Sequence, residues 1–154
     1  MIQKLRERSG SESGFTLVEL LVVMLILGLL AAIAIPSFFN QRDKAKDADA
    51  KEAVRTAQTA VETYATDNDG FYNGGPGGTP PDAAALVAIE PSLGNADISD
   101  VTTGDKSYSV TVDSEVSGQS FTISRAATGI LDSECTVHEQ AGCPSDGNWA
   151  ADGS

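Results

Sequence analysis

The longest apolar stretch of the chain runs from Gly14 to Phe39 and contains a single charged residue, Glu19. About 20 consecutive apolar residues are enough for a helix to cross the ~30 Å hydrocarbon core of a bilayer. The pattern therefore predicts a membrane-spanning helix. A carboxylate inside such a span costs roughly 2.5–3.5 kcal/mol on insertion scales, so Glu19 either lies at the membrane interface or has a functional partner.

Helical patterning continues beyond this span, because residues 41–65 are rich in Ala, Lys, Glu, Gln and Arg, which are strong helix formers. Five residues recur at helical spacing and predict a stripe that packs on a folded domain, namely Val54, Ala57, Val61, Tyr64 and Ala65. We expect one long helix from Phe15 to about Asp67. Pro36 removes one helix hydrogen bond, so a separate soluble helix after Pro36 is the alternative, and Gly28–Pro36 is the weakest part of the helix.

The remainder of the chain predicts a loop, a short helix and a small sheet. Residues 68–80 are rich in Gly and Pro and predict a long irregular loop, and residues 83 to about 90 predict a short helix. Polar and apolar residues alternate in 107–113 and 119–124, which predicts an antiparallel hairpin, and a third strand is expected near 129–133. The side chains expected to face the helix are Tyr108, Val110, Val112, Phe121 and Ile123. Because a lone hairpin is marginal in water, we expect an α+β fold in which the long N-terminal helix packs on a small antiparallel sheet.

The segment before the apolar run differs from an ordinary secretory signal. It carries a basic start, Lys4, Arg6 and Arg8, but no convincing small-residue cleavage site follows the apolar run. A polar segment, residues 9–14, precedes the run instead. A cut there would remove the charged leader and keep the apolar helix. The positive-inside rule places the basic leader on the cytoplasmic side and the C-terminal domain outside.

The sequence GFTLVE at the start of the apolar run resembles the processing and assembly signature of type IV prepilins and the related pseudopilins. The resemblance covers the leader and the apolar run. It implies that a prepilin peptidase cleaves between Gly14 and Phe15 and that Phe15 becomes the N-methylated terminus. Glu19 matches the family's assembly glutamate, and Gly28 and Pro36 fall where pilin helices often carry Gly and Pro. The fold that it implies is type IV pilin-like.

The spacing of Phe15 and Glu19 supports these implied roles, because residues four apart share one face of a helix. Cleavage would create a cationic amine at Phe15, which Glu19 can neutralise within its own subunit or in a neighbouring subunit of a filament. We expect Glu19 to align the incoming subunit, and we expect Gly28–Pro36 to be partly unwound in the filament. The expected parts of the chain are a cleaved leader 1–14, a helix 15–67 that forms the membrane anchor and filament core, and a globular head 68–154.

Net charge and cysteine content indicate which ligands and cross-links the chain is expected to have. The formal net charge of −12 disfavours non-specific binding to nucleic acid. The two cysteines, Cys135 and Cys143, are expected to form a disulfide in an exported domain, with two free thiols as the alternative. They form no CxxC pair, so a zinc site is not expected. A C-terminal disulfide loop also resembles the variable region that many pilins expose.

Few residues suggest catalysis or metal binding. Asp67, Asn68 and Asp69 cluster oxygen atoms as calcium requires, but the acid expected at the end of an EF-hand loop is absent, so calcium is only a minor alternative to no cofactor. His138 is expected to be a surface residue, and Trp149 is expected to pin the tail. No G-x-S-x-G, P-loop or H-E-x-x-H sequence is present, and we expect no enzymatic activity.

The resemblance implies a structural subunit of a type IV pilus that polymerises through its hydrophobic helix after leader cleavage and N-methylation. A pseudopilin of a type II secretion system or a minor pilin is the alternative. A membrane-tethered extracytoplasmic binding module with an uncleaved anchor is disfavoured by the GFTLVE sequence. The implied partners are copies of the chain itself in a helical filament, the prepilin peptidase, the pilus assembly machinery and, before assembly, the inner or cytoplasmic membrane. The implied location is a single-pass membrane protein with its N-terminus inside, and then an extracellular pilus.

Overall fold

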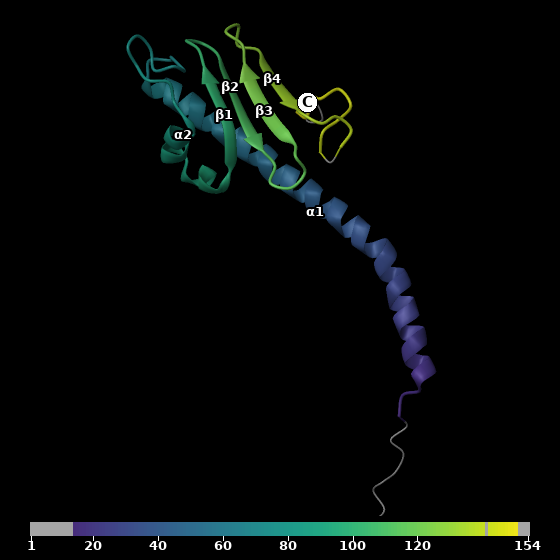
Figure 1. Cartoon of the computed structure of the whole chain (residues 1–154). Helices are drawn as coiled ribbons and strands as arrows, with labels where there is room; N and C mark the ends of the chain where they lie inside the picture. Colours follow the sequence, from purple (N-terminus) through teal and green to yellow (C-terminus); the bar gives the residue numbers. More distant parts are fainter. Residues whose placement is uncertain (1–13, 141, 151–154) are drawn as a thin grey trace, which may run out of the picture. The chain divides into compact units, whose positions relative to one another are not determined.

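The computed structural model describes residues 14–140 and 142–150 (Figure 1). It divides into two compact units, residues 1–39 and residues 40–154, which are described separately. Apart from Gly14, the expected leader lies outside the described residues.

A single helix, α1 (Leu17–Asp67), supplies residues to both units. It begins at Leu17 rather than at the expected Phe15, and it ends at the expected Asp67. Pro36 lies inside α1, so the alternative of a separate helix after this proline is wrong. The helix ends because Asp69 adopts a left-handed conformation with φ of 54°, and the Gly70 amide donates to the Ala65 carbonyl at 2.7 Å.

In the second unit, α1 presents one buried stripe to the sheet. Its buried residues are Asp47, Ala50, Val54, Ala57, Ala60, Val61 and Ala65. Four of the five residues predicted for this stripe are therefore confirmed. The prediction was wrong for Tyr64, which is half-buried, and its hydroxyl donates a hydrogen bond to the Thr79 carbonyl in the neighbouring loop.

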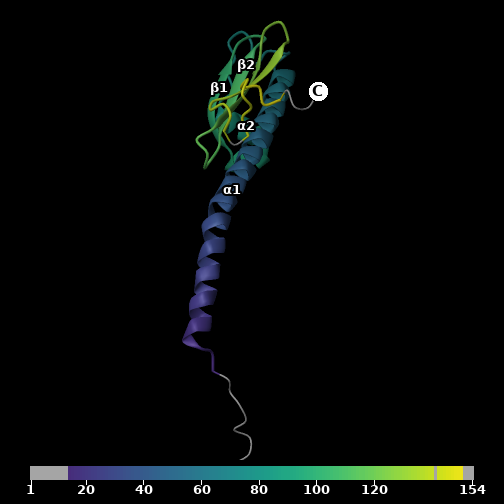
Figure 2. The ribbon, with the colours of Figure 1, turned by 90° about the vertical axis from the view of Figure 1, so that its right-hand side faces the viewer.

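A four-stranded antiparallel sheet in the order β1-β2-β3-β4 (Figure 1) lies against this part of α1 (Figure 2). Its strands are β1 (Asp97–Thr103), β2 (Tyr108–Asp113), β3 (Ser120–Arg125) and β4 (Leu131–Cys135). The predicted hairpin is β2 and β3, in which Val110 pairs with Ile123 and Val112 with Phe121. These side chains are buried in the core with Tyr108, as predicted. The third predicted strand is β4, which begins two residues after the expected start.

The sequence did not predict the edge strand β1. Its burial pattern contains no buried residue, and the chain bulges between Ile98 and Asp100, so no regular alternation marks it as a strand. The strand β1 forms because it pairs with β2, since its own sequence has no strand pattern.

The short helix was predicted within one residue. It is α2 (Ala83–Ile89), and the Asp82 carboxylate caps it by accepting from the Ala85 amide at 2.8 Å. A 3-10 helix, η1 (Pro91–Asn95), follows it. Leu86 of α2 and Leu93 of η1 close the core beside α1 and the sheet.

Candidate assembly site on the N-terminal helix

The first turn of α1 is closed by a reciprocal pair of polar side chains. The Thr16 amide and hydroxyl both donate to Glu19 Oε2 at 2.8 Å, and the Glu19 amide donates to Thr16 Oγ1 at 3.2 Å. This is a capping box, in which a Thr at the N-cap and a Glu three residues later satisfy each other's free backbone amides. The pair explains why α1 begins directly after Thr16. Glu19 therefore has a partner within its own helix.

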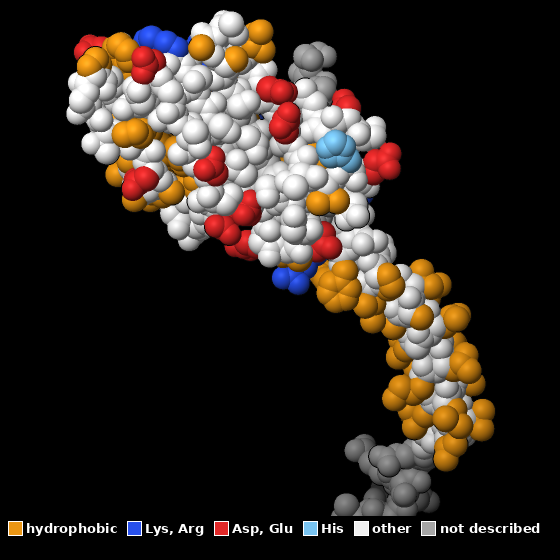
Figure 3. All heavy atoms as spheres, turned by 45° about the horizontal axis from the view of Figure 1, so that its top comes forward, with side chains coloured by type: hydrophobic (Ala, Val, Ile, Leu, Met, Phe, Trp, Pro, Cys, Tyr) orange, Lys and Arg blue, Asp and Glu red, His pale blue; other side chains and the backbone are white. Residues whose placement is uncertain are grey.

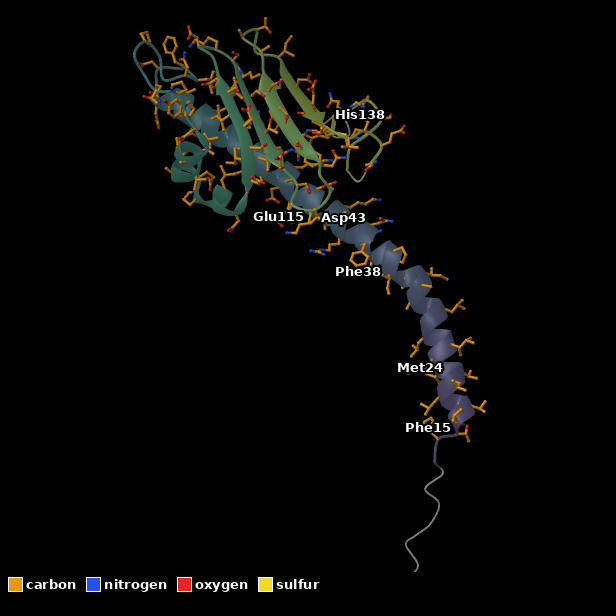
Figure 4. The ribbon with its side chains drawn as sticks, viewed as in Figure 1. Phe15, Met24, Phe38, Asp43, Glu115 and His138 are labelled. Atoms are coloured by element: carbon orange, nitrogen blue, oxygen red, sulfur yellow. A yellow bond between two sulfur atoms is a disulfide. The ribbon has the colours of Figure 1, made fainter. Side chains whose placement is uncertain are left out.

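Phe15, directly before this cap, and the apolar side chains that follow the cap are exposed on all sides. Phe15 is 81% exposed, Met24 69% and Phe38 68%. Figure 3 shows hydrophobic side chains projecting along both sides of this part of α1, and Figure 4 shows the side chains of Phe15, Met24 and Phe38 pointing away from the backbone. Among the described residues, α1 is the helix that is long and apolar enough to cross a membrane. Such a surface is stable in hydrocarbon or against other apolar helices rather than in water.

The residues expected to be processed, to direct assembly and to give flexibility lie on α1 or directly before it. Gly14 and Phe15 lie before the first turn, outside the helix. Gly28 and Pro36 lie inside α1, and a Cβ atom added at Gly28 would meet nothing within 4 Å. Packing within one chain therefore does not require a glycine at the position of Gly28. Whether the segment between the two unwinds in a filament stays a prediction.

In the second unit, the two cysteines form a disulfide that closes a C-terminal loop. Trp149 is 4% exposed, and its indole Nε1 donates to the Glu134 carbonyl at 2.8 Å, so it anchors the tail on β4. His138 is exposed in the loop. Within residues 14–140 and 142–150, no group of three or more His, Cys, Asp or Glu side chains is arranged to hold a metal ion, and this includes Asp67 and Asp69.

A buried carboxylate that the sequence did not reveal joins this loop to α1. Asp47 is fully buried; its Oδ1 accepts from the Ser117 hydroxyl, and its Oδ2 accepts from the Gly142 amide at 3.1 Å. Lys51, one turn further along α1, donates to the Gly142 carbonyl. Asp47 lies three residues before Ala50 and seven before Val54, which places it on the buried stripe of α1. This helical spacing is the sequence feature from which its burial could have been predicted.

A second polar network ties α1 to the sheet. Glu62 accepts hydrogen bonds from the Tyr72 hydroxyl at 2.7 Å and from the Tyr108 hydroxyl at 3.1 Å. Burial raises the pKa of both tyrosines, and the neighbouring Glu62 carboxylate raises it further. Lys46 and Glu115 form an ion pair at 2.9 Å. The hydrogen bond within this pair raises the pKa of Lys46 and lowers the pKa of Glu115.

The residues of the cap and most of the apolar part of α1 match a known sequence family. The family described as the prokaryotic N-terminal methylation motif matches residues 10–35. This range contains Gly14, Phe15, Glu19 and Gly28, and it ends one residue before Pro36.

Three relatives of known name share part of the chain. The type IV major pilin protein PilA of Myxococcus xanthus is 34% identical over 82 residues, which are 53% of this chain and 33% of PilA. The type II secretion system core protein G of Pseudomonas aeruginosa is 42% identical over 57 residues, 37% of this chain and 40% of that protein. The competence protein ComGC of Halalkalibacterium halodurans is 36% identical over 58 residues, 38% of this chain and 57% of ComGC.

The matches thus span between a third and three fifths of the length of these relatives. Their names are those of a pilin, a secretion protein and a competence protein, and none is that of an enzyme. No solved structure matches the chain. By its methylation motif, its exposed apolar helix and these relatives, the chain is similar to the type IV pilins and the type II secretion pseudopilins.

Proposed function

We propose that this protein is a structural subunit of a type IV pilus, anchored in the membrane before assembly and polymerised through its apolar helix. The observation that carries the proposal is the apolar half of α1, whose side chains are exposed all round. Leaving this surface in water is unfavourable by roughly 25 cal/mol for each Å² of apolar area. A bilayer covers it before assembly, and the helices of neighbouring subunits cover it in a filament.

Processing at the Gly14–Phe15 bond would complete the assembly site. Cleavage converts the Phe15 amide nitrogen into a cationic amine, one residue before the Thr16 cap, and the family motif implies that this amine is methylated. Both hydrogen bonds from Thr16 reach Glu19 Oε2, so Oε1 can accept from a neighbouring subunit's amine without breaking the cap. A buried ion pair of this kind contributes more to register than to stability. Glu19 therefore selects the axial position of the incoming subunit.

A second function of the same type is a pseudopilin of a type II secretion system or a minor pilin. The identity of 42% with a secretion core protein G favours it. Such a subunit would use the same anchor, cleavage and Glu19 contact, but in a short and transient fibre. The membrane-tethered module with an uncleaved anchor gains no support from these relatives. The partners that we propose are other copies of the chain, a prepilin peptidase and the assembly machinery in the membrane.

The abundance and length of surface fibres separate the two functions. Cells that express the chain together with its native machinery are sheared, and the released material is examined by electron microscopy and immunoblotting, with a deletion strain as control. Abundant long fibres that contain the chain support the pilus subunit. Fibres that are absent from the shear fraction but appear as short pili on overexpression support the secretion pseudopilin. A chain that stays monomeric in the membrane under both conditions contradicts both.

A further inference from the structure

An open groove lies at one end of the helix–sheet sandwich, between α1, η1 and the paired ends of β1 and β2. Its volume is about 250 Å³. The floor is formed by small apolar side chains, Ala50, Ala53, Ala96 and Val112, and the rim by Asp49, Asp97, Asp113, Glu115 and Lys46. An apolar floor under an acidic rim fits a long basic side chain, which buries its aliphatic stem and keeps its charged end at the rim.

Two acids on this rim, Asp97 and Asp113, form no ion pair with the described residues of their own subunit. Asp97 and Asp113 lie directly opposite each other in the β1–β2 register, and like charges in such a pair are destabilising. The single cation of the rim, Lys46, pairs with Glu115 at 2.9 Å, while Asp49 lies 4.0 Å from it. The groove thus holds an excess of negative charge that a cation from outside would relieve.

The basic residues that could supply this cation are few. Most basic residues of the second unit are already engaged: Lys46 with Glu115, Lys51 with Gly142, Arg55 with the Trp149 ring, Lys106 with Gly70, and Arg125 with Glu62. Arg42 and Lys44 remain, both exposed on α1 on either side of Asp43, and neither forms a hydrogen bond or ion pair with the described part of the chain. They do not line the groove of their own subunit. Lys46 has the largest effect in lowering the pKa of Glu115, and the charge of Arg42 in the same subunit lowers it further.

We propose that this acidic groove binds the Arg42–Lys44 segment of a second copy of the chain. The inference rests on the proposed filament, because it requires many copies side by side. The groove and the basic segment are different surfaces of one chain, so each copy offers one of each. Such a heterologous contact continues from copy to copy, and it builds an open helical fibre when the rotation does not close.

The net charge of the chain explains why this contact would matter. At −12, copies repel one another at long range, and a local match of opposite charges both lowers that repulsion and fixes which parts meet. The apolar helices would supply most of the association free energy but little axial discrimination, since one apolar turn resembles the next. The groove would provide a second register contact, in the heads, besides the one at Glu19.

Charge reversal in the full-length chain tests this contact. In cells that form wild-type fibres, Arg42→Glu with Lys44→Glu, and separately Asp97→Lys with Asp113→Lys, are each expected to lower the yield of sheared fibres about tenfold, as for the weaker interfacial charge pairs measured by double-mutant cycles. Combining the four substitutions makes the rim net positive and the segment net negative, which restores the attraction with its sign reversed, and the yield is expected to recover to near the wild-type level. Asp100→Lys is the matched control, since this exposed residue of β1 has the same charge and lies outside the groove.

Two measurements distinguish a defect in folding from a defect in assembly. The amount of each variant in the membrane fraction, with its disulfide formed, reports folding independently of fibre yield. An intersubunit disulfide between Lys44→Cys and Asp97→Cys, seen as a ladder of multimers in sheared fibres, reports proximity directly. Full yield from both reversal variants, or loss without recovery in the combined variant and no ladder, overturns the inference. Wild-type fibres would leave the proposed function standing in that case, whereas the absence of wild-type fibres would remove both.

Discussion

Removing the buried carboxylate of Asp47 is expected to weaken the attachment of α1 to the disulfide loop and to the turn between β2 and β3. Asp47→Ala deletes two hydrogen bonds, from the Ser117 hydroxyl and the Gly142 amide, and it leaves both donors without this acceptor. A hydrogen bond to a charged group contributes roughly 1.5–3 kcal/mol, so the free energy of unfolding should fall by about 3–4 kcal/mol. Asp47→Asn keeps one acceptor oxygen and should cost less than half as much.

Chemical unfolding of the full chain in detergent measures this loss. Trp149 is the single tryptophan and is buried in the tail that packs beside the loop, so its fluorescence follows the relevant part of the head. Asp49→Ala, on the exposed side of the same helix, is the control and should change stability by no more than about 0.5 kcal/mol. A loss below about 1 kcal/mol for Asp47→Ala would contradict the anchoring role of this residue.

Four further predictions follow from the same contacts. Glu19→Ala is expected to abolish or sharply reduce filament yield while leader cleavage stays intact, because the incoming amine loses its carboxylate partner; normal yield in a shear assay would refute this. Tyr108 has a pKa raised above its ordinary value of about 10, so the stability of the head should be constant below that pH and fall as the pH rises further. Tyr108→Phe should flatten this alkaline slope in unfolding titrations, and an unchanged slope would exclude Tyr108 as its source. Replacing Cys135 and Cys143 by Ser should cost about 2.5 kcal/mol for a loop of this size, and reduction of the wild type should reproduce the loss. Cryo-electron microscopy of the filament should show broken i to i−4 hydrogen bonds within Gly28–Pro36, where uninterrupted bonds would disprove the flexible segment.

The sequence predicts those parts of the fold in which apolar residues recur with a clear helical or strand periodicity. The apolar run fixes the first half of α1, the buried stripe fixes the second half, and strict alternation fixes β2 and β3. Each of these patterns follows directly from which face of an element is buried. The expected helix start was wrong by two residues, because Thr16 caps the helix through its side chain instead of entering it.

The parts that were missed depend on tertiary contacts. β1 is an edge strand with a bulge and charged positions, and its pairing with β2 creates it. Asp47 was not recognised because a charged residue on a helix is usually solvent-exposed, whereas here two loops distant in sequence supply its donors, Ser117 between β2 and β3 and Gly142 in the disulfide loop. The Thr16–Glu19 cap is an exception: it is local and was missed, although the T-x-x-E spacing alone indicates it. The acidic groove, by contrast, requires the register that brings Asp97 opposite Asp113.

The chemical identity of the N-terminus in sheared surface material tests the central claim most directly. Intact mass and terminal peptide sequencing of the recovered chain would provide it, with the membrane fraction of the same cells measured in parallel. The account predicts a chain that begins at an N-methylated Phe15 and is abundant in fibres. A chain that retains Met1 and stays in the membrane fraction would contradict cleavage, the assembly role of Glu19 and the filament itself.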